Sequence, residues 1–376
     1  MDGFAVRSGS LTPSRLPICG TVAAGAPPAT FRRPLAPGSV MRISTGAPLP
    51  EGADAVVPIE QATVDPDDDA PMAAFSVGSV DAWSNVHRQA VDARAGQVVL
   101  KAGTLLGPHH LAVAATVGAV ELAVAERPRV ALLTTGDEVR PAELPTEQLE
   151  PQQIRNSNGP MMAAFLGAIG TELVMQRHVL DDADQTETAA RDALSQAHCV
   201  ITAGGVSVGT RDRLPGAWRS LGCETVLHGV AIRPGKPLLV VTGKLNHAAP
   251  LVIGLPGNPV SVLTTAHLFV WPVLVKMMRG DSESTTLPWR DVVLADPVSA
   301  QRQREVFRTA RLCNLSRVQV IPWHGSGDLM HTAHADGFVR LPRQDAPVPE
   351  GTTLRFLPCV SGSAAPPISI ESPGKL

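Results

Sequence analysis

The chain has 376 residues, about two or three domains by length, and its 44% hydrophobic and 18% charged residues exclude wholesale disorder. A formal charge of −3, the lack of tyrosine and an aromatic content of 3% provide neither a basic field nor stacking platforms, which excludes nucleic acid as a partner. The five cysteines are scattered without a C-x-x-C pair, as expected of reduced thiols in a cytoplasmic protein.

The N-terminal third is predicted to be a β module over residues 1–95, followed by a helical connector over residues 96–127. Short β-branched runs such as 40–43 and 55–57 alternate with Gly and Pro turns and show no helical period. In the connector, Pro108 and Gly118 bracket one helix. Its apolar stretch is about half the ~20 residues of a membrane span, and no basic leader begins the chain, so neither membrane insertion nor export is expected.

Residues 128–281 are predicted to form a three-layer α/β domain. Four apolar runs without alternation indicate strands buried on both faces, at residues 130–134, 199–202, 238–241 and 251–253. Helical patterns run from about Asn156 to Gly170, and from Asp184, which has capping-box spacing to Glu187, to about Ala197. This alternation predicts a parallel sheet with helices on both sides. Multidomain α/β plus β is therefore the expected fold class.

The C-terminal part is predicted to be a small β-barrel over residues 282–360, because short apolar runs are separated there by Pro and Gly. Residues 361–376 are rich in Ser and Pro, which predicts a disordered tail. His331 and His334 lie three residues apart without a third ligand in register, so we expect surface residues and not a zinc site.

The polar turns after the four predicted strands are the candidates for chemistry, because open α/β sheets bind ligands outside the carboxyl ends of their strands. The first turn follows the run 130–134 and contains Asp137 and Glu138. Two adjacent carboxylates could hold a hard cation through oxygen ligands. A solvated turn or a helix cap is the alternative interpretation.

The second turn, residues 203–212, contains three glycines whose backbone N–H groups could cradle an anion, namely Gly204, Gly205 and Gly209. Ser207 adds a hydroxyl, and Asp212 could hold Mg²⁺ against a phosphate-bearing ligand. The alternative is a flexible connection with Asp212 as a helix N-cap. The turn is not a Walker loop, because no Gly-Lys-Ser/Thr follows.

The third turn, residues 233–237, holds Arg233 and Lys236 on a rigid Pro-Gly-x-Pro bend, which suits an oxyanion such as molybdate or a phosphate. A plain surface turn with both cations solvated is the alternative. The fourth turn precedes a helix that begins near Val260, and its candidate residues are Pro256, Gly257 and Asn258. Capping by Pro259 explains that turn equally well.

In order and spacing, the four turns resemble the molybdopterin molybdenumtransferase family, which includes the E domain of gephyrin. Two earlier stretches are also similar to family signatures: Met1 to Arg7, and Arg42 to Pro50 with the following Gly-Ala-Asp-Ala-Val-Val. The similarity extends from Met1 to about Pro358. It implies an enzyme that takes adenylylated molybdopterin and molybdate, cleaves the pterin-AMP linkage with a divalent cation, and forms molybdenum cofactor and AMP.

The resemblance also implies a homodimer, with each site between the α/β domain of one chain and the β module of the other. It places Asp2 and Thr45 on the β-module side, and it assigns three acids to Mg²⁺, namely Asp137, Glu138 and Asp212. Converging acids repel one another unless a cation neutralises them, so Mg²⁺ dependence is expected. Arg233 and Lys236 would hold the oxyanion, with Arg308 and Ser326 carried over from less distinct motifs. The adenylyltransferase of the preceding step is the partner that the resemblance suggests.

Three departures from the family pattern stand out. Relatives carry several dozen residues before the Met-Asp-Gly signature, and this chain begins inside it. The family's Arg-x-Gly-Glu-Asp reads Arg-Gln-Ala-Val-Asp at residues 88–92, and Arg233 stands where Lys is usual.

Alternative functions are the adenylyltransferase, whose single α/β domain shares the Gly-Gly-x-Ser-x-Gly turn, and a scaffold or impaired paralogue. The flanking β modules argue against the first, and the intact polar turns argue against a scaffold.

Overall fold

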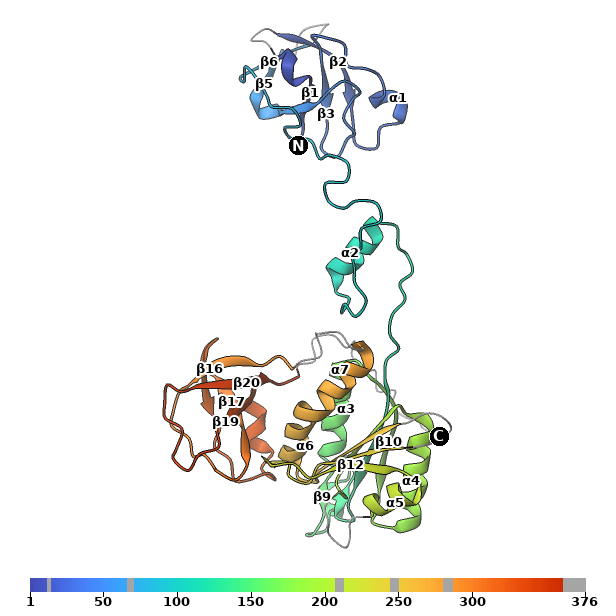
Figure 1. Cartoon of the computed structure of the whole chain (residues 1–376), viewed down its shortest axis with the longest axis vertical. Helices are drawn as coiled ribbons and strands as arrows, with labels where there is room; N and C mark the ends of the chain where they lie inside the picture. Colours follow the sequence, from blue (N-terminus) through green and yellow to red (C-terminus); the bar gives the residue numbers. More distant parts are fainter. Residues whose placement is uncertain (12–14, 66–70, 207–212, 244–249, 280–286, 361–376) are drawn as a thin grey trace. The chain divides into compact units, whose positions relative to one another are not determined.

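The computed structural model describes residues 1–376 apart from 12–14, 66–70, 207–212, 244–249, 280–286 and 361–376. The predictions for Ser207, Gly209, Asp212 and the C-terminal tail therefore lie outside the described residues. The chain divides into two compact units, Met1–Lys101 and Ala102–Leu376. Figure 1 shows both units and labels many of their helices and strands.

The first unit is built on a six-stranded sheet with the order β4-β1-β3-β2-β6-β5. The strands are β1 (Gly3–Val6), β2 (Leu16–Val22), β3 (Val40–Ile43), β4 (Ala55–Pro58), β5 (Ala62–Val64) and β6 (Met72–Phe75). Three short helices accompany them: η1 (Ser8–Ser10), α1 (Pro28–Phe31) and η2 (Ile59–Gln61). Phe4 and Val6 belong to one apolar cluster and Ala5 to another, so β1 is buried on both faces. The predicted β module is confirmed.

The second unit begins with α2 (Pro108–Thr116), the helix predicted in the connector. It has Pro108 at its first turn, and Gly118 follows its end with a φ of +76°.

The centre of the second unit is a six-stranded sheet with the order β10-β7-β11-β15-β14-β12. The strands are β7 (Arg129–Thr135), β10 (Glu172–Val179), β11 (Cys199–Ala203), β12 (Glu224–His228), β14 (Leu239–Thr242) and β15 (Leu251–Leu255). One face is covered by α3 (Asn158–Ile169), α6 (Pro259–Thr265), the π turn η4 (Ala266–Val270) and α7 (Trp271–Arg279). The other face is covered by α4 (Ala183–Gln196) and α5 (Leu214–Ser220), which completes the predicted three layers.

The prediction of a wholly parallel sheet is wrong at one of the four predicted strands. Strands β10, β7, β11 and β15 run parallel, but β14 runs antiparallel to β15. Only about eight residues separate these two strands, which is too short for the crossover that a parallel pair requires. The start of β14 therefore lies at the carboxyl end of β15, where Leu239 is opposite Gly254.

The edge strands β10 and β12 were not predicted, because neither has the unbroken apolar run of a strand buried on both faces.

The helix α3 ends at Gly170, as predicted, with a φ of +92°. The capping prediction for α4 is wrong. Its N-cap is Asp182, whose Oδ1 accepts the Gln185 N–H at 2.9 Å, while Glu187 forms an exposed pair with Arg191.

The C-terminal strands close into a five-stranded barrel, β17-β18-β16-β20-β19 with β19 returning to β17, which confirms the predicted small barrel. The strands are β16 (Arg290–Leu294), β17 (Glu305–Leu312), β18 (Arg317–Val320), β19 (Gly337–Leu341) and β20 (Thr353–Pro358), with the helix η6 (Met330–His334) before β19. A sixth strand, β13 (Ile232–Arg233), pairs in parallel with β17 and joins the barrel to the α/β domain. Three minor elements remain: β8 (Val139–Arg140), β9 (Ile154–Arg155) and η3 (Thr146–Gln148).

The continuous helix Pro259–Met278 is long and apolar enough to cross a membrane by length and composition alone. Half of that helix is buried inside the protein. Four of its residues recur at helical spacing and pack into the core beneath the sheet: Val262, Ala266, Val270 and Leu274. The core position explains its apolar character.

His267, in the π turn, joins this helix to the end of the barrel. Its Nδ1 lies 2.8 Å from the Leu263 carbonyl oxygen and its Nε2 accepts the Val360 N–H at 3.0 Å. The ring contacts Phe165 and Phe338. Burial of this ring lowers the pKa of His267 from 6.5 to about 4.

The folded chain should therefore lose stability in mild acid. Below pH 6.5 the unfolded state binds a proton at His267 that the folded state does not accept until about pH 4. This residue alone should lower the free energy of unfolding by about 2 kcal/mol between about pH 7.5 and about pH 5. Urea unfolding at both pH values measures the difference. His267→Gln should reduce the pH dependence, and His334→Gln, at an exposed position, should leave it unchanged.

Candidate functional site

The polar turns after β7, β11 and β15 meet at one edge of the sheet. Ala203, the last residue of β11, is paired with Thr134 on one side and Leu255 on the other. A Cβ added to Gly257 would lie 3.7 Å from the Gly204 Cα, so the second and fourth turns are in contact. These three turns therefore form one continuous surface, as the sequence predicted from strand direction.

Gly204 and Gly205 have left-handed backbones, with φ of +95° and +68°. A Cβ at Gly204 would lie 2.8 Å from the Thr135 Oγ1, and one at Gly205 would lie 3.0 Å from the same oxygen. Both positions thus require glycine for conformation and for space. The closely packed backbone at this edge is the part of the predicted anion cradle that the structure describes.

The acidic end of the edge is the turn that carries Asp137 and Glu138, both exposed. Asp137 Oδ1 accepts the backbone N–H of Asp181 at 3.0 Å. Glu138 folds back over Gly136, where a Cβ would lie 2.8 Å from its Oε2. The turn thus presents two exposed carboxylates, and Asp212, the third predicted acid, lies outside the described residues.

His178 fixes this turn, and sequence reasoning missed it. Its Nδ1 lies 3.0 Å from Thr134 Oγ1, and its Nε2 lies 3.1 Å from the carbonyl oxygen of Gly136. Asn156 donates to the same threonine oxygen at 2.9 Å, so the hydroxyl proton points to Nδ1 and Nε2–H donates to Gly136. Burial lowers the pKa of His178, which favours this neutral form.

The basic end of the edge is the turn at residues 233–237. It precedes β14 instead of following a strand, and it reaches the edge only because β14 is antiparallel. Gly235 has a φ of +108°, and a Cβ there would lie 2.4 Å from Thr265 Cγ2 of α6. Arg233 is paired with Val306 of β17, and Lys236 is exposed. This turn thus links the sheet edge to the barrel.

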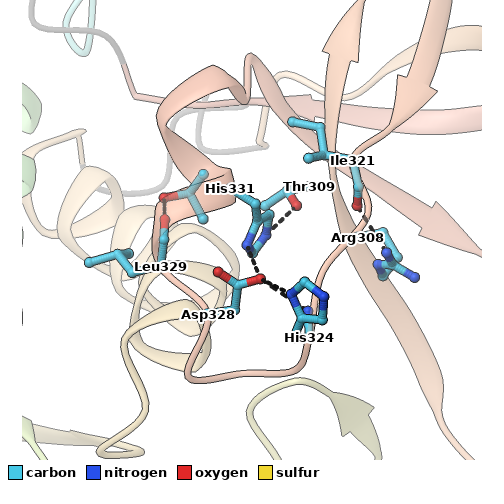
Figure 2. Close-up of polar contacts among 8 residues, drawn as sticks. Arg308, Thr309, Ile321, His324, Asp328, Leu329 and His331 are labelled. Carbon is cyan, nitrogen blue, oxygen red and sulfur yellow. Dashed lines mark hydrogen bonds and ion pairs between the residues drawn. The ribbon is translucent and has the colours of Figure 1, made fainter.

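Arg308, two residues beyond Val306 on β17, brings a second guanidinium to this end. Its Nη2 donates to the Ile321 carbonyl oxygen at 3.0 Å (Figure 2). Its Cζ lies 4.8 Å from the Trp323 ring centroid. Its Nε is buried and has no hydrogen-bond partner among the described residues. Burial and then the charge of Arg233 lower the pKa of Arg308 to about 10. The two guanidiniums therefore repel each other.

No ion pair between described residues involves Arg233, Lys236 or Arg308. Cations that are close together and partly desolvated are stabilised by an anion that accepts their hydrogen bonds. The described part of this end of the edge provides donors without an acidic partner. Its charge arrangement is that of an anion site.

Asn258 and Ser326, predicted from separate motifs, are in contact. Asn258 Nδ2 donates to Ser326 Oγ at 2.8 Å, and the Val260 N–H donates to the Ser326 carbonyl oxygen at 3.1 Å. Ser326 therefore satisfies an N–H in the first turn of α6, and Asn258 forms no side-chain cap. Asn158 Nδ2 holds the same turn through the Gly257 carbonyl oxygen at 2.7 Å. The barrel loop is thereby attached to the sheet edge.

Within the first unit, Asp2 and Thr45 are also in contact. Asp2 Oδ1 accepts the Thr45 backbone N–H at 2.6 Å and its hydroxyl at 3.0 Å, and these hydrogen bonds lower the pKa of Asp2.

Ala90, at the position where the family pattern has glycine, has a left-handed φ of +65°. Asp92, which matches the pattern, lies 2.7 Å from the Nε2 of His87.

The two ends of the edge are separated by three strand spacings. Counting from β7 through β11 and β15 to β14, the acidic and basic turns are roughly 14 Å apart. An elongated ligand lying along the edge can contact both turns. The backbone of the glycine turns lies between them.

Comparison with known proteins gives the same assignment in all three parts of the chain. Family models match the MoeA N-terminal region (domain I and II) over residues 1–118, a probable molybdopterin binding domain over 131–276, and the MoeA C-terminal region (domain IV) over 291–359. In structure, the chain is similar to a molybdopterin biosynthesis MoeA protein from Pyrococcus horikoshii, with a TM-score of 0.76, 27% identity, and coverage of 96% of this chain and 87% of that one.

Relatives with the name molybdopterin molybdenumtransferase include proteins of Synechococcus elongatus and Staphylococcus aureus. The protein of Synechococcus elongatus is 36% identical over 349 residues, which cover 91% of this chain and 83% of that protein. The protein of Staphylococcus aureus strain COL is 32% identical over 373 residues, which cover 96% and 85%. The resemblance drawn from the sequence motifs is confirmed, and the chain belongs to the molybdopterin molybdenumtransferase family.

Proposed function

We propose that this chain inserts molybdenum into molybdopterin in the biosynthesis of the molybdenum cofactor. The reaction takes adenylylated molybdopterin and molybdate, cleaves the pterin-AMP linkage, and releases AMP and the cofactor. One observation supports the proposal most directly: a single sheet edge has two carboxylates at one end and cations without acidic partners, among the described residues, at the other. A substrate with a phosphate linkage and a separate oxyanion fits that separation.

In this proposal the basic end binds molybdate. Arg233, Lys236 and Arg308 supply N–H donors, and the hydroxyl of Ser326 lies at the neighbouring turn after β15 through its contact with Asn258. The binding of a dianion offsets the repulsion between the two guanidiniums and gives the buried Arg308 Nε a favourable electrostatic partner.

The pterin phosphates lie in this proposal along the glycine turns. Gly204, Gly205 and Gly257 provide backbone without side chains, Pro256 precedes Gly257 in the fourth turn, and Ser207 and Gly209 belong to the same predicted turn as Gly204. The substrate thus contacts the sheet edge between the two charged ends.

The acidic end fits Mg²⁺ in its donor chemistry. Asp137 and Glu138 provide exposed carboxylate oxygens, the ligands that this cation prefers, and the Asp181 N–H occupies only one oxygen of Asp137. We assign Asp212 as the third acid. When bound, the cation neutralises charge on the phosphate linkage that is cleaved. His178 holds the turn that presents the two described acids.

The site is completed in this proposal by a homodimer, in which the first unit of the partner supplies Asp2 and Thr45. The hydrogen bonds that Thr45 donates lower the pKa of the Asp2 carboxylate. All five cysteines are free thiols, which is consistent with a cytoplasmic enzyme. The adenylyltransferase that makes the substrate is the proposed upstream partner. A scaffold role would need neither the acidic turn nor the basic one.

The reaction should be observable as AMP release from adenylylated molybdopterin by the purified chain, dependent on both molybdate and Mg²⁺. Asp137→Asn and Asp212→Ala should each lower the rate about tenfold or more, since loss of a carboxylate ligand worth about 1.4 kcal/mol has that effect. Glu143→Gln, an exposed acid beyond the turn, is the matched control and should retain the full rate. Release that chelator leaves unchanged would count against the Mg²⁺ site.

Removal of cations from the basic end should weaken molybdate binding selectively. Arg233→Ala and Arg308→Ala should each raise the KM for molybdate about tenfold, because each removes a charge-assisted hydrogen-bond donor. Arg302→Ala is the matched control, since Arg302 is exposed in the same barrel and pairs with Asp345. Equal KM values in all three variants would place the oxyanion elsewhere.

A further inference from the structure

A polar cluster behind the proposed oxyanion site joins the loop of residues 323–331 to the barrel strand β17 (Figure 2). His331 is at its centre. The side chain of His331 is 6% exposed, which corrects the prediction of a surface residue. Its Nε2 lies 2.9 Å from Thr309 Oγ1, and Thr309 is 3% exposed and adjacent to Arg308 on β17. One hydrogen bond thus connects the loop to the strand beside the guanidinium.

Asp328 connects the other side of His331 to the turn that contains Ser326. Asp328 Oδ2 lies 3.5 Å from His331 Nδ1 and accepts the His324 backbone N–H at 3.0 Å. The Nδ1 of His331 is buried without a well-aligned hydrogen bond to any described residue, and the Asp328 carboxylate is its charged neighbour. The turn from residue 324 to residue 328 is therefore closed by one carboxylate, and Ser326 lies at its middle.

Trp323 lies between His331 and Arg308. One face of its ring is 4.8 Å from the Arg308 Cζ, and its centroid is 6.1 Å from the His331 ring at an interplanar angle of 70°. His331 therefore contacts the loop on both sides of Ser326, at Trp323 before it and at Asp328 after it. The barrel contributes two proposed oxyanion ligands, Arg308 and Ser326. Arg308 contacts Trp323 of this loop, and Ser326 is part of it.

We propose that His331 is a positioning residue for the oxyanion site. It holds the Trp323 ring against Arg308 and the Ser326 turn against the start of α6, and it does not touch the anion. The inference rests on the proposed function of Arg308 and Ser326. An arginine or a loop that must be ordered on binding reduces affinity, so a cluster that orders both in advance increases it.

The test is molybdate binding to the full chain by isothermal titration calorimetry, with molybdate alone as the probe. His331→Ala should weaken binding about tenfold, equivalent to about 1.4 kcal/mol, through loss of one buried hydrogen bond and the order that it imposes. His331→Gln, which can place an amide near the Nε2 position and reach Thr309, should retain most of the affinity. His334→Ala, exposed in the same short helix, should bind as the unchanged chain does.

A second readout separates positioning from general damage to the fold. In the AMP-release assay, His331→Ala should raise the KM for molybdate while kcat at saturating molybdate stays within about twofold, because uniform binding is lost and the acidic end is untouched. If the alanine variant does not fold, the comparison of His331→Gln with His331→Asn decides. The shorter amide falls short of Thr309, so the asparagine variant must bind more weakly than the glutamine variant.

Arg308→Ala distinguishes failure of this inference from failure of the proposed function. If Arg308→Ala loses molybdate and His331→Ala does not, the positioning role is overturned and the oxyanion site stands. If Arg308→Ala binds molybdate as the unchanged chain does, the proposed site is wrong and the inference fails with it. Equal weakening by alanine and glutamine at position 331 also overturns the role assigned to the Thr309 hydrogen bond.

Discussion

The register between β11 and its two neighbours determines where the polar turns after β7, β11 and β15 lie. Because β7, β11 and β15 are parallel and end level with one another, their carboxyl ends bring a carboxylate pair, a glycine turn and an asparagine turn to one edge. The reversed direction of β14 then adds two cations to the same edge. A change in the direction or register of one strand would move its turn to the opposite edge or bury it.

Charge separation along this edge is the feature with the most chemical content. Like charges are grouped at each end, where they destabilise the protein by mutual repulsion, and the opposite signs lie roughly 14 Å apart, beyond mutual neutralisation. A ligand of the opposite charge bound at each end would offset this repulsion. His178 and the glycine backbones maintain the arrangement without adding charge, since the lowered pKa of His178 favours its neutral form.

The barrel takes part in the site and is more than an appended module. Strand β13 continues the sheet of the barrel into the basic turn, and Ser326 satisfies an N–H group in the first turn of α6. Arg308 therefore reaches the edge from a strand about 70 residues after the turn that it faces. The buried His267 makes a second connection, between the long core helix and Val360, two residues after the last barrel strand. These contacts explain why the α/β domain and the barrel form one compact unit.

The sequence by itself determined the fold class, the family and the candidate residues, because apolar runs, Pro and Gly turns and ordered motifs are local patterns. Only the tertiary structure decided that β14 is antiparallel, that Asp182 and not Asp184 caps α4, and that His331 is buried. The roles of His178 and of the Asn258–Ser326 contact depend on residues far apart in the chain. The physical reason is that burial and hydrogen-bond partners are set by strand pairing and packing, which no local spacing encodes.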